Sequence, residues 1–394
     1  MLELGATVTA VLLLLAFCTI IDAADADTLP EVAGYKLYEA ETISSVDGSA
    51  QPIVVGHPQT VSSGAHDAEP LPLLVGVHSW SVNRLSSARQ QAKVAADHCW
   101  LAVFPDFRGP NLTSNPHATE AGASLLAQRD IIDAVEYMKS HFPVDSSRIY
   151  IMGGSGGGHM SLMMACKYPD VWAAVSAWCP ITCMRQWWEQ QNSYSPHIEA
   201  VCGGKPGDSA QVDFEYLRRS PRSFIANCAT IPVAIHHGQM DPTIFCPQTW
   251  QTFSLLADIP DHYVIFASDS TGHFADYVRG AAWLEGQIKS DRPPDRLTLA
   301  TDEAKWFFWC FLAPAREMTL ATAKVSVDRS HDQPKLTISA RNASQVRIDL
   351  DALGVKLTET QLGAGATVED AVLTLLPPTP GADIGLSTPV APVR

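Results

Sequence analysis

The chain has 394 residues, of which 46% are hydrophobic, so it can bury a sizeable core. Its formal net charge of −15 at pH 7, with no basic stripe along the sequence, excludes a nucleic-acid partner, because phosphates are bound by clustered lysine and arginine side chains. The length suits one large α/β domain with a small additional unit.

The chain opens with a nearly continuous apolar run over residues 8–21. This run is too short to span a bilayer, and it has the length of the hydrophobic region of a secretory signal. Small residues at 24–26 offer a cleavage site. We therefore predict a signal peptide over residues 1–26, a secreted or periplasmic location, and no stable membrane insertion.

Eight cysteines follow the predicted signal, and an even number in an exported chain predicts two to four disulfides of unassigned pairing. Cys166 lies in a predicted helix and is interpreted as a buried free thiol. The cysteine and histidine spacings match no zinc motif, so no metal or other cofactor is predicted. The eight are Cys99, Cys166, Cys179, Cys183, Cys202, Cys228, Cys246 and Cys310.

From residue 27 to residue 314 predicted strands and helices alternate, which predicts a mostly parallel sheet with helices on both faces. Apolar and alternating runs predict strands over residues 35–42, 51–55, 71–77, 100–105, 149–151, 172–177, 231–236 and 263–267. Helices are predicted over residues 86–97, 125–141, 160–167 and 302–311.

Two stretches depart from this alternation. Residues 179–229 are rich in aromatic residues and are predicted to form a lid-like insertion, with a purely structural excursion as the alternative. Residues 322–376 alternate polar and apolar side chains at period two, which predicts a small antiparallel β-rich appendage. Residues 377–394 are rich in proline and are expected to form a flexible tail.

The strongest chemical signal lies at residues 148–162. A short strand there meets the sequence Gly-Gly-Ser-Gly-Gly at 153–157, and a run of helix-forming residues follows. A strand, a Gly-x-Ser-x-Gly turn and a helix form a nucleophile elbow, in which the glycines let the strand and the helix approach closely. Ser155 is therefore the predicted nucleophile.

A serine hydroxyl needs an imidazole base, and a carboxylate must orient that imidazole. Around such an elbow the acid follows the serine along the chain and the histidine follows the acid. Asp241 and His273 each lie in a loop directly after a predicted strand. We predict that Asp241 orients His273, the general base and then acid. The alternatives are Asp258, Asp261 and Asp269 for the acid, and His159, His236, His237 and His262 for the base.

Attack by the serine creates an oxyanion, which needs preorganised N–H donors. The backbone N–H of Gly156 is the first predicted donor, because it directly follows the nucleophile. The second is the N–H of Trp80 in the loop after the strand at 71–77, with that of Ser79 as the alternative. We also predict that three aromatic side chains contact the substrate, namely His78, Trp187 and Trp188.

Several motifs together resemble the catalytic domain of the prolyl oligopeptidase family and related secreted esterases, over roughly residues 70–312. They are the elbow with its preceding strand, Asp-Ile-Ile-Asp at 130–133, Phe-Arg-Gly at 107–109, Arg-Ser-Pro at 219–221 and His237-Gly238-x-x-Asp241. The resemblance implies the α/β-hydrolase fold and the same triad of Ser155, Asp241 and His273. The chain departs from the family at His78-Ser79, where His-Gly is usual, and in the residues after Asp241.

These features predict a serine hydrolase that cleaves carboxylic esters through an acyl-enzyme on Ser155. The expected partner is a small or oligomeric ester, with a carbohydrate ester as one option. One alternative is a serine peptidase of the prolyl-oligopeptidase type that acts on short peptides. The other is a non-catalytic binding protein built on a hydrolase fold.

Overall fold

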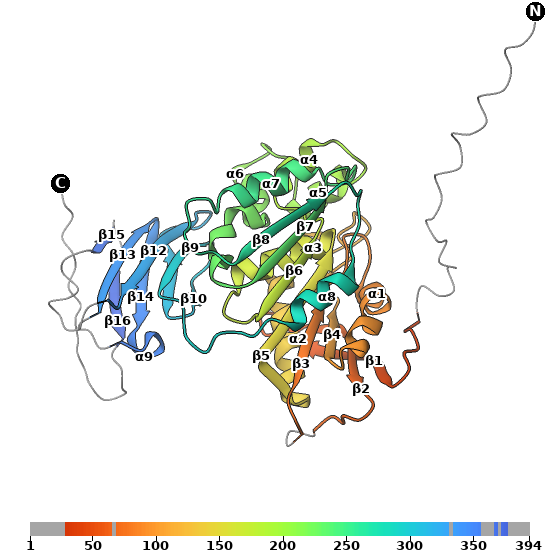
Figure 1. Ribbon diagram of the computed structural model, residues 1–394. Helices are drawn as coiled ribbons and strands as arrows, with labels where there is room; N and C mark the ends of the chain where they lie inside the picture. The colour runs from red at the N-terminus through yellow and green to blue at the C-terminus, as the bar shows by residue number, and fades with distance from the viewer. Residues whose placement is uncertain (1–27, 65–67, 331–333, 356–365, 369–371, 377–394) are drawn as a thin grey trace, which may run out of the picture.

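The computed structural model describes residues 28–64, 68–330, 334–355, 366–368 and 372–376 (Figure 1). The predicted signal peptide and the predicted proline-rich tail lie outside these residues. Among the helices described, none combines the length and the apolar character that crossing a membrane requires.

An eight-stranded sheet in the order β1-β2-β4-β3-β5-β6-β7-β8 forms the larger unit. β1, β2 and β4 pair antiparallel, and the pairs from β4 through β3 to β8 are parallel. The parallel strands are apolar runs because both of their faces are buried. The strands are β1 (Tyr35–Ile43), β2 (Ala50–Pro58), β3 (Leu71–Gly76), β4 (Leu101–Pro105), β5 (Val144–Gly154), β6 (Ala174–Trp178), β7 (Val233–Gly238) and β8 (Val264–Asp269).

Helices cover both faces of this sheet, so the predicted α/β-hydrolase architecture is confirmed (Figure 1). α1 (Arg84–Asp97) and α8 (Tyr277–Glu285) pack on one face, and α2 (Leu125–His141) and α3 (Gly156–Lys167) pack on the other. The side chains that they bury against the strands include Leu85 and Leu284 on the first face and Ile131 and Leu162 on the second.

The predicted insertion at 179–229 is helical and has a core of its own. It contains α4 (Met184–Glu189), α5 (Ser195–Cys202), α6 (Ala210–Arg218) and the short 3₁₀ helices Pro221–Ser223 and Ile225–Thr230, and α7 (Cys246–Ser254) follows β7. Apolar side chains of α4, α5 and α6 cluster with Trp80. Arg219 fixes the end of the insertion, because its guanidinium donates to the carbonyl oxygens of Thr119 and Ala121.

The eight cysteines after residue 27 are all free thiols in the described structure, so the predicted disulfides are wrong. Six of them are buried, where cysteine acts as a small apolar residue. Cys166, for example, is fully buried in α3, as predicted.

The C-terminal unit is a sandwich of two four-stranded sheets, β15-β13-β12-β9 and β10-β11-β14-β16. Apolar side chains from β9 through β14 form the core between them. The unit begins at β9 rather than at residue 322, and two of its strand pairs, β13 with β15 and β14 with β16, are parallel. The elements are β9 (Arg296–Thr301), β10 (Lys305–Phe307), β11 (Cys310–Pro314), β12 (Ala321–Asp328), β13 (Lys335–Arg341), β14 (Ala343–Asp349), α9 (Leu350–Leu353), β15 (Ala366–Val368) and β16 (Val372–Leu376).

The helix predicted over residues 302–311 is wrong, and so is the boundary predicted at residue 314. β10 and β11 form a hairpin there, in which Phe307 lies opposite Cys310 and Phe308 turns the chain with a φ of 54°. Phe307 and Trp309 fill the core of the sandwich. Aromatic residues fit a pleated, half-buried surface well, so a run of them favours a strand as readily as a helix.

Candidate active site

Ser155 lies between the end of β5 and the start of α3, the position of a nucleophile elbow. Its backbone has φ 58° and ψ −118°, which is a strained conformation for a residue other than glycine. A Cβ on Gly153 would lie 2.6 Å from the carbonyl carbon of Gly157. Only glycine therefore allows the strand and the helix to come this close.

Asp241 and His273 are brought together from the loops after β7 and β8. His273 Nδ1 lies 2.7 Å from Asp241 Oδ2. The other carboxylate oxygen of Asp241 accepts from the backbone N–H groups of Thr243, at 2.8 Å, and Ile244, at 2.9 Å. The Asp241 side chain is fully buried and that of His273 is 27% exposed. The carboxylate is thus fixed by the backbone and orients an accessible imidazole.

His237 also contacts Asp241, although the sequence suggested it only as an alternative base. Its Nε2 lies 2.8 Å from the carbonyl oxygen of Ile244 and 3.2 Å from Asp241 Oδ2. Both neighbours are acceptors, so we place the proton on Nε2, and Nδ1 accepts from the Thr249 hydroxyl at 2.8 Å. The ring is buried. His237 is therefore a positioning residue for the acid.

Burial and hydrogen bonds oppose each other in the titration of the pair. Burial alone would raise the pKa of Asp241, but hydrogen bonds from His237 and His273 outweigh it and hold that pKa well below its usual range. Burial alone would lower the pKa of His273, but hydrogen bonds to Asp241 and Cys179 raise it above the ordinary value of 6.5. The two shifts describe an imidazole whose protonated form is stabilised by the carboxylate.

Cys179 is a neighbour of the site that the sequence did not reveal. Its thiol donates to the carbonyl oxygen of Phe274, the residue after His273, at 3.4 Å. Its backbone has a positive φ of 37° directly after β6. The position at the end of a central strand was the available signal, because that edge of a parallel sheet collects functional side chains.

Ser155 and His273 line one open pocket of about 450 Å³, which we call the Ser155 pocket. Its other lining residues are Ser79, Gln90, Gly154, Cys179, Phe274, Ala275 and Tyr277. None of the alternative acids and histidines is among these lining residues. His159 and His236 are instead held at a low pKa of about 4, chiefly by burial.

The loop after β3 is placed against the elbow by His78. The ring nitrogens of His78 each lie 2.8 Å from a carbonyl oxygen, those of Ser79 and Asp106, and the ring stacks on Phe107. A Cβ on Gly156 would lie 2.4 Å from the backbone nitrogen of Trp80, so the two predicted oxyanion donors are neighbours.

The predicted substrate contacts of His78 and Trp187 are wrong. Both side chains are buried, and Trp187 donates from Nε1 to the carbonyl oxygen of Thr243 while its ring packs edge-on against Trp80. Trp188 is half-buried, bonds Glu199 and is not among the lining residues of the Ser155 pocket. Aromatic residues of an insertion with its own core are needed for that core.

Among the residues that the structure describes, one group of side chains could hold a metal ion. Cys179, Asp241 and His273 present ligand atoms that lie within 4.8 Å of one another. However, the proton on His273 Nδ1 already bridges to Asp241. A metal would replace this proton and end the orientation of the imidazole.

Comparisons with known proteins identify the family of the chain. The sequence model of the prolyl oligopeptidase family matches residues 87–286. The probable acetylxylan esterase A of Aspergillus flavus is 23% identical over 165 residues, which are 41% of this chain and 52% of that protein. The S-formylglutathione hydrolase of Mus musculus is 27% identical over 227 residues, 49% of this chain and 77% of that one. The chain thus spans about half the length of the first of these relatives.

A solved structure shows the same fold. An acylaminoacyl peptidase in complex with Z-Gly-Gly-Phe-chloromethyl ketone superposes with a TM-score of 0.53 at 17% sequence identity. The superposition covers 66% of this chain and 43% of the peptidase.

Proposed function

Because this chain belongs to the prolyl oligopeptidase family and is a serine hydrolase, we propose that it cleaves carboxylic esters through an acyl-enzyme on Ser155. The observation that carries the proposal is that Ser155, on its strained elbow, and His273, oriented by Asp241, line one open pocket. Relatives named acetylxylan esterase and S-formylglutathione hydrolase support ester cleavage.

The reaction follows from the placement of the protons. His273 Nδ1 donates to Asp241, which leaves Nε2 free to take the proton of the Ser155 hydroxyl as its oxygen attacks the ester carbonyl. The N–H groups of Gly156 and Trp80, with Ser79 as the alternative to Trp80, receive the oxyanion. His273 then returns the proton to the leaving alcohol. In the second half of the reaction, Nε2 takes a proton from the water that attacks the acyl-enzyme and returns it to the Ser155 oxygen as the acid leaves.

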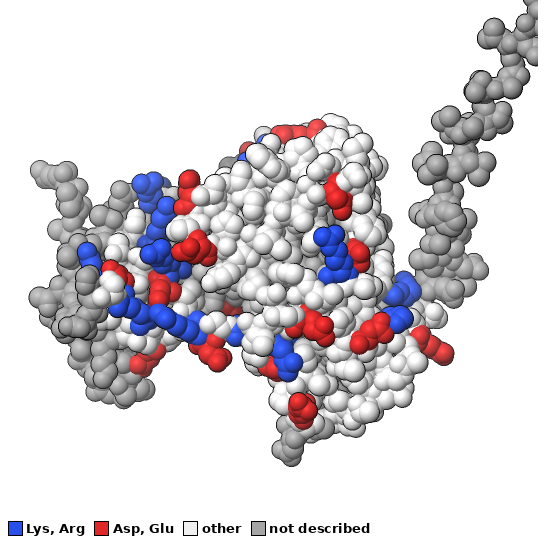
Figure 2. Space-filling model, viewed as in Figure 1, with Lys and Arg blue, Asp and Glu red and all other residues white. Residues whose placement is uncertain are grey.

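The Ser155 pocket favours an ester over a peptide. Apart from the imidazole of His273, its lining residues carry no charged side chain that could pair with a peptide terminus. The face drawn in Figure 2 has only scattered acidic and basic side chains over the α/β unit, with a broad uncharged area over β6, β7 and β8. A neutral ester suits such a surface better than a charged peptide does.

Turnover of a substrate panel tests the proposal. Acetyl, butyryl and feruloyl esters should be hydrolysed with a higher kcat/KM than Xaa-Pro anilides by the purified chain. Preferential turnover of the anilides would instead support the second candidate, a peptidase, which the family and the peptidase of similar fold keep open. If the purified chain hydrolyses no substrate of the panel, the third candidate, a non-catalytic binding protein, is supported.

The activity is expected to depend on pH through His273. The base must be neutral, and its pKa is raised above 6.5, so the acidic limb of kcat/KM should have its midpoint above pH 6.5. The Cys179→Ala variant should move the midpoint to lower pH, because the protonated imidazole of His273 donates to the sulfur of Cys179 and this contact contributes to the raised pKa of His273. Both predictions are tested by measuring kcat/KM between about pH 5 and about pH 10. A midpoint below pH 6.5 in the wild type would contradict the raised pKa of His273.

We also propose that the protein acts outside the cytoplasm. The support is the predicted signal peptide in the sequence.

A further inference from the structure

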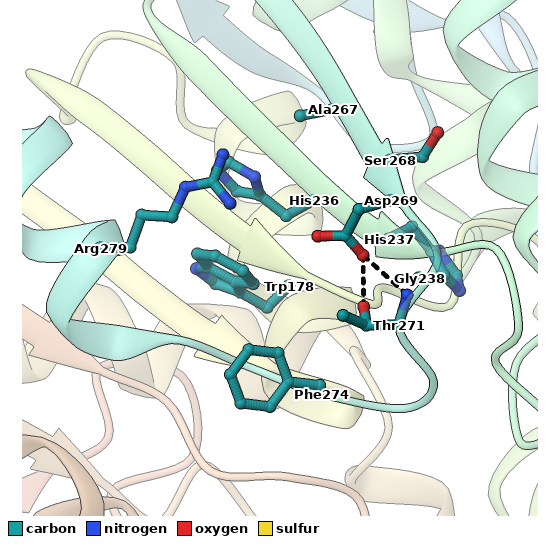
Figure 3. A pocket seen from close by; sticks show the side chains of 10 residues that line it. All are labelled: Trp178, His236, His237, Gly238, Ala267, Ser268, Asp269, Thr271, Phe274 and Arg279. Carbon is teal, nitrogen blue, oxygen red and sulfur yellow. Dashed lines mark hydrogen bonds between the residues drawn. The ribbon is translucent and has the colours of Figure 1, made fainter.

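Figure 3 shows a second pocket, which we call the Arg279 pocket. It has a volume of about 200 Å³, and its lining includes Trp178, His236, Asp269, Thr271, Phe274 and Arg279. Phe274 lines both pockets, so the two are adjacent across this ring. Apart from His237, which contacts Asp241, no residue that lines the Arg279 pocket has a role in the proposed reaction.

The Arg279 pocket lies on the His273 side of the nucleophile. Its residues come from the carboxyl ends of β6, β7 and β8 and from the first turn of α8. The oxyanion loop follows β3, Ser155 follows β5, and the sheet order places β5 between β3 and β6. The predicted oxyanion donors and the Arg279 pocket therefore lie on opposite sides of Ser155.

The pocket offers both a hydrogen-bond donor and an acceptor. Arg279 is exposed, and its guanidinium makes no ion pair or hydrogen bond with other residues described here. One oxygen of Asp269 accepts from the N–H and the hydroxyl of Thr271. Figure 3 shows the other oxygen turned toward the interior of the pocket.

The charges of the pocket cancel. Burial, followed by the nearby Arg279 guanidinium, lowers the pKa of His236 to about 4, so this imidazole is neutral at pH 7. Among the residues that line the pocket, the remaining charges are the Arg279 cation and the Asp269 carboxylate. A carboxylate in the pocket disfavours an anionic ligand, and a guanidinium disfavours a cationic one. A neutral ligand with several hydroxyl groups matches this pair.

Phe274 supplies an apolar surface next to these polar groups. Its side chain is 53% exposed although it follows His273 directly and meets Trp178 only edge-on. A ligand that covers this exposed ring would remove its apolar surface from water. A sugar ring has hydroxyl groups at its edge and C–H groups on its face, which fits an aromatic ring beside fixed polar groups.

We propose that the Arg279 pocket binds the alcohol part of the substrate and that this alcohol is a neutral carbohydrate unit. The inference rests on the proposed esterase function. When the tetrahedral intermediate collapses, the bond between the acyl carbon and the alcohol oxygen breaks, and the proton on His273 Nε2 moves to that oxygen. The alcohol must therefore lie on the His273 side, away from the oxyanion donors.

The size of the pocket limits what it binds. Its volume of about 200 Å³ is below the roughly 300–1,000 Å³ of pockets that enclose a drug-sized ligand. It therefore takes one sugar ring, and the acyl group occupies the larger Ser155 pocket.

Two esters with the same acyl group and different alcohols test the proposal. We compare acetylated xylobiose with ethyl acetate in the wild type, in Arg279→Gln and in Arg316→Gln, a matched variant of an exposed arginine in the C-terminal unit. The ratio of kcat/KM for the sugar ester to that for ethyl acetate should fall about ten-fold in Arg279→Gln, because hydrogen bonds from a charged donor to the alcohol are lost. It should not change in Arg316→Gln.

A binding measurement separates the two levels of the inference. Calorimetry with Ser155→Ala protein should detect xylobiose, and the double variant with Arg279→Gln should bind it about ten-fold more weakly. Ester hydrolysis with an unchanged ratio in Arg279→Gln would overturn the subsite alone. Tighter binding of glucuronate than of xylose would overturn the neutral ligand. A wild type that hydrolyses no ester would overturn the proposed function itself.

Discussion

Replacing Ser155 with alanine is expected to lower kcat for esters by about 10⁴-fold or more, because no acyl-enzyme can form without the hydroxyl. Residual turnover would come from the oxyanion donors and from substrate binding. Labelling by a fluorophosphonate probe should disappear in the same variant, since the probe reacts with an activated serine. Ester turnover and probe labelling thus test the Ser155 hydroxyl oxygen by two independent reactions.

Ser161 provides the matched control for Ser155→Ala. It lies on the same helix, its side chain is buried, and its hydroxyl finds no hydrogen-bond partner among the residues that the structure describes. The Ser161→Ala variant should therefore keep both labelling and turnover at the wild-type level. Equal labelling of Ser155→Ala and wild type would show that another residue is the nucleophile.

The elbow could be predicted because its signal is local. The glycines at 153–157 occur together because close backbone contacts leave no room for a Cβ: Gly153 faces the backbone of Gly157, and Gly156 and Gly157 face the backbone of the loop after β3. The structure also brings Asp241 and His273 within hydrogen-bond distance, from two loops that each follow a strand. Parallel strands end at one edge of the sheet, so strand-end loops are the segments that can meet there.

The neighbours of His273 could not be predicted, because their contacts are made across long sequence separations. Cys179 reaches the carbonyl of Phe274 from 95 residues away, and the two meet only because the end of β6 and the loop after β8 meet. The substrate contact predicted for Trp187 is wrong for a related reason. An aromatic residue in an insertion looks the same in the sequence whether it contacts a substrate or fills the core of that insertion.

The boundary between the two units was misplaced because the interactions that join them are also distant in the sequence. Lys167, the last residue of α3, forms an ion pair with Asp302, 135 residues later, just after β9. Arg218 Nη2 lies 2.7 Å from the second oxygen of Asp302. The side chains of Lys167 and Asp302 are 0% and 1% exposed. This buried cluster connects the nucleophile helix to the C-terminal unit.

The Asp302→Asn variant is expected to lose about 3 kcal/mol of unfolding free energy, the lower end for a broken buried ion pair. Lys167 and Arg218 lose their shortest carboxylate contact and keep only the longer contacts, both of 3.4 Å, to Glu303 and Glu215. Urea unfolding followed by tryptophan fluorescence measures the loss. Asp97→Asn is the matched control. Asp97 forms an exposed ion pair with Lys93, so this variant should lose less than about 1 kcal/mol. Equal losses in the two variants would contradict the structural role of the cluster.

The contribution of Asp302 should also vanish at low pH. Burial alone would raise the pKa of this carboxyl, but Lys167 and Arg218 outweigh burial and lower it below the ordinary value of 3.8. A depressed pKa in the folded state stabilises the fold above pH 3.8, and the stabilisation is lost as the pH falls through the folded-state value. The difference in unfolding free energy between wild type and Asp302→Asn should therefore shrink below pH 3.8.

The same variant separates support from catalysis in the C-terminal unit. α3 begins next to Ser155 and ends at Lys167, so the cluster stabilises the far end of the helix that carries the elbow. If this contact only stabilises the fold, kcat of Asp302→Asn should match the wild type at temperatures where both are folded. A lower kcat in the folded variant would mean that the C-terminal unit holds the elbow in its reactive geometry.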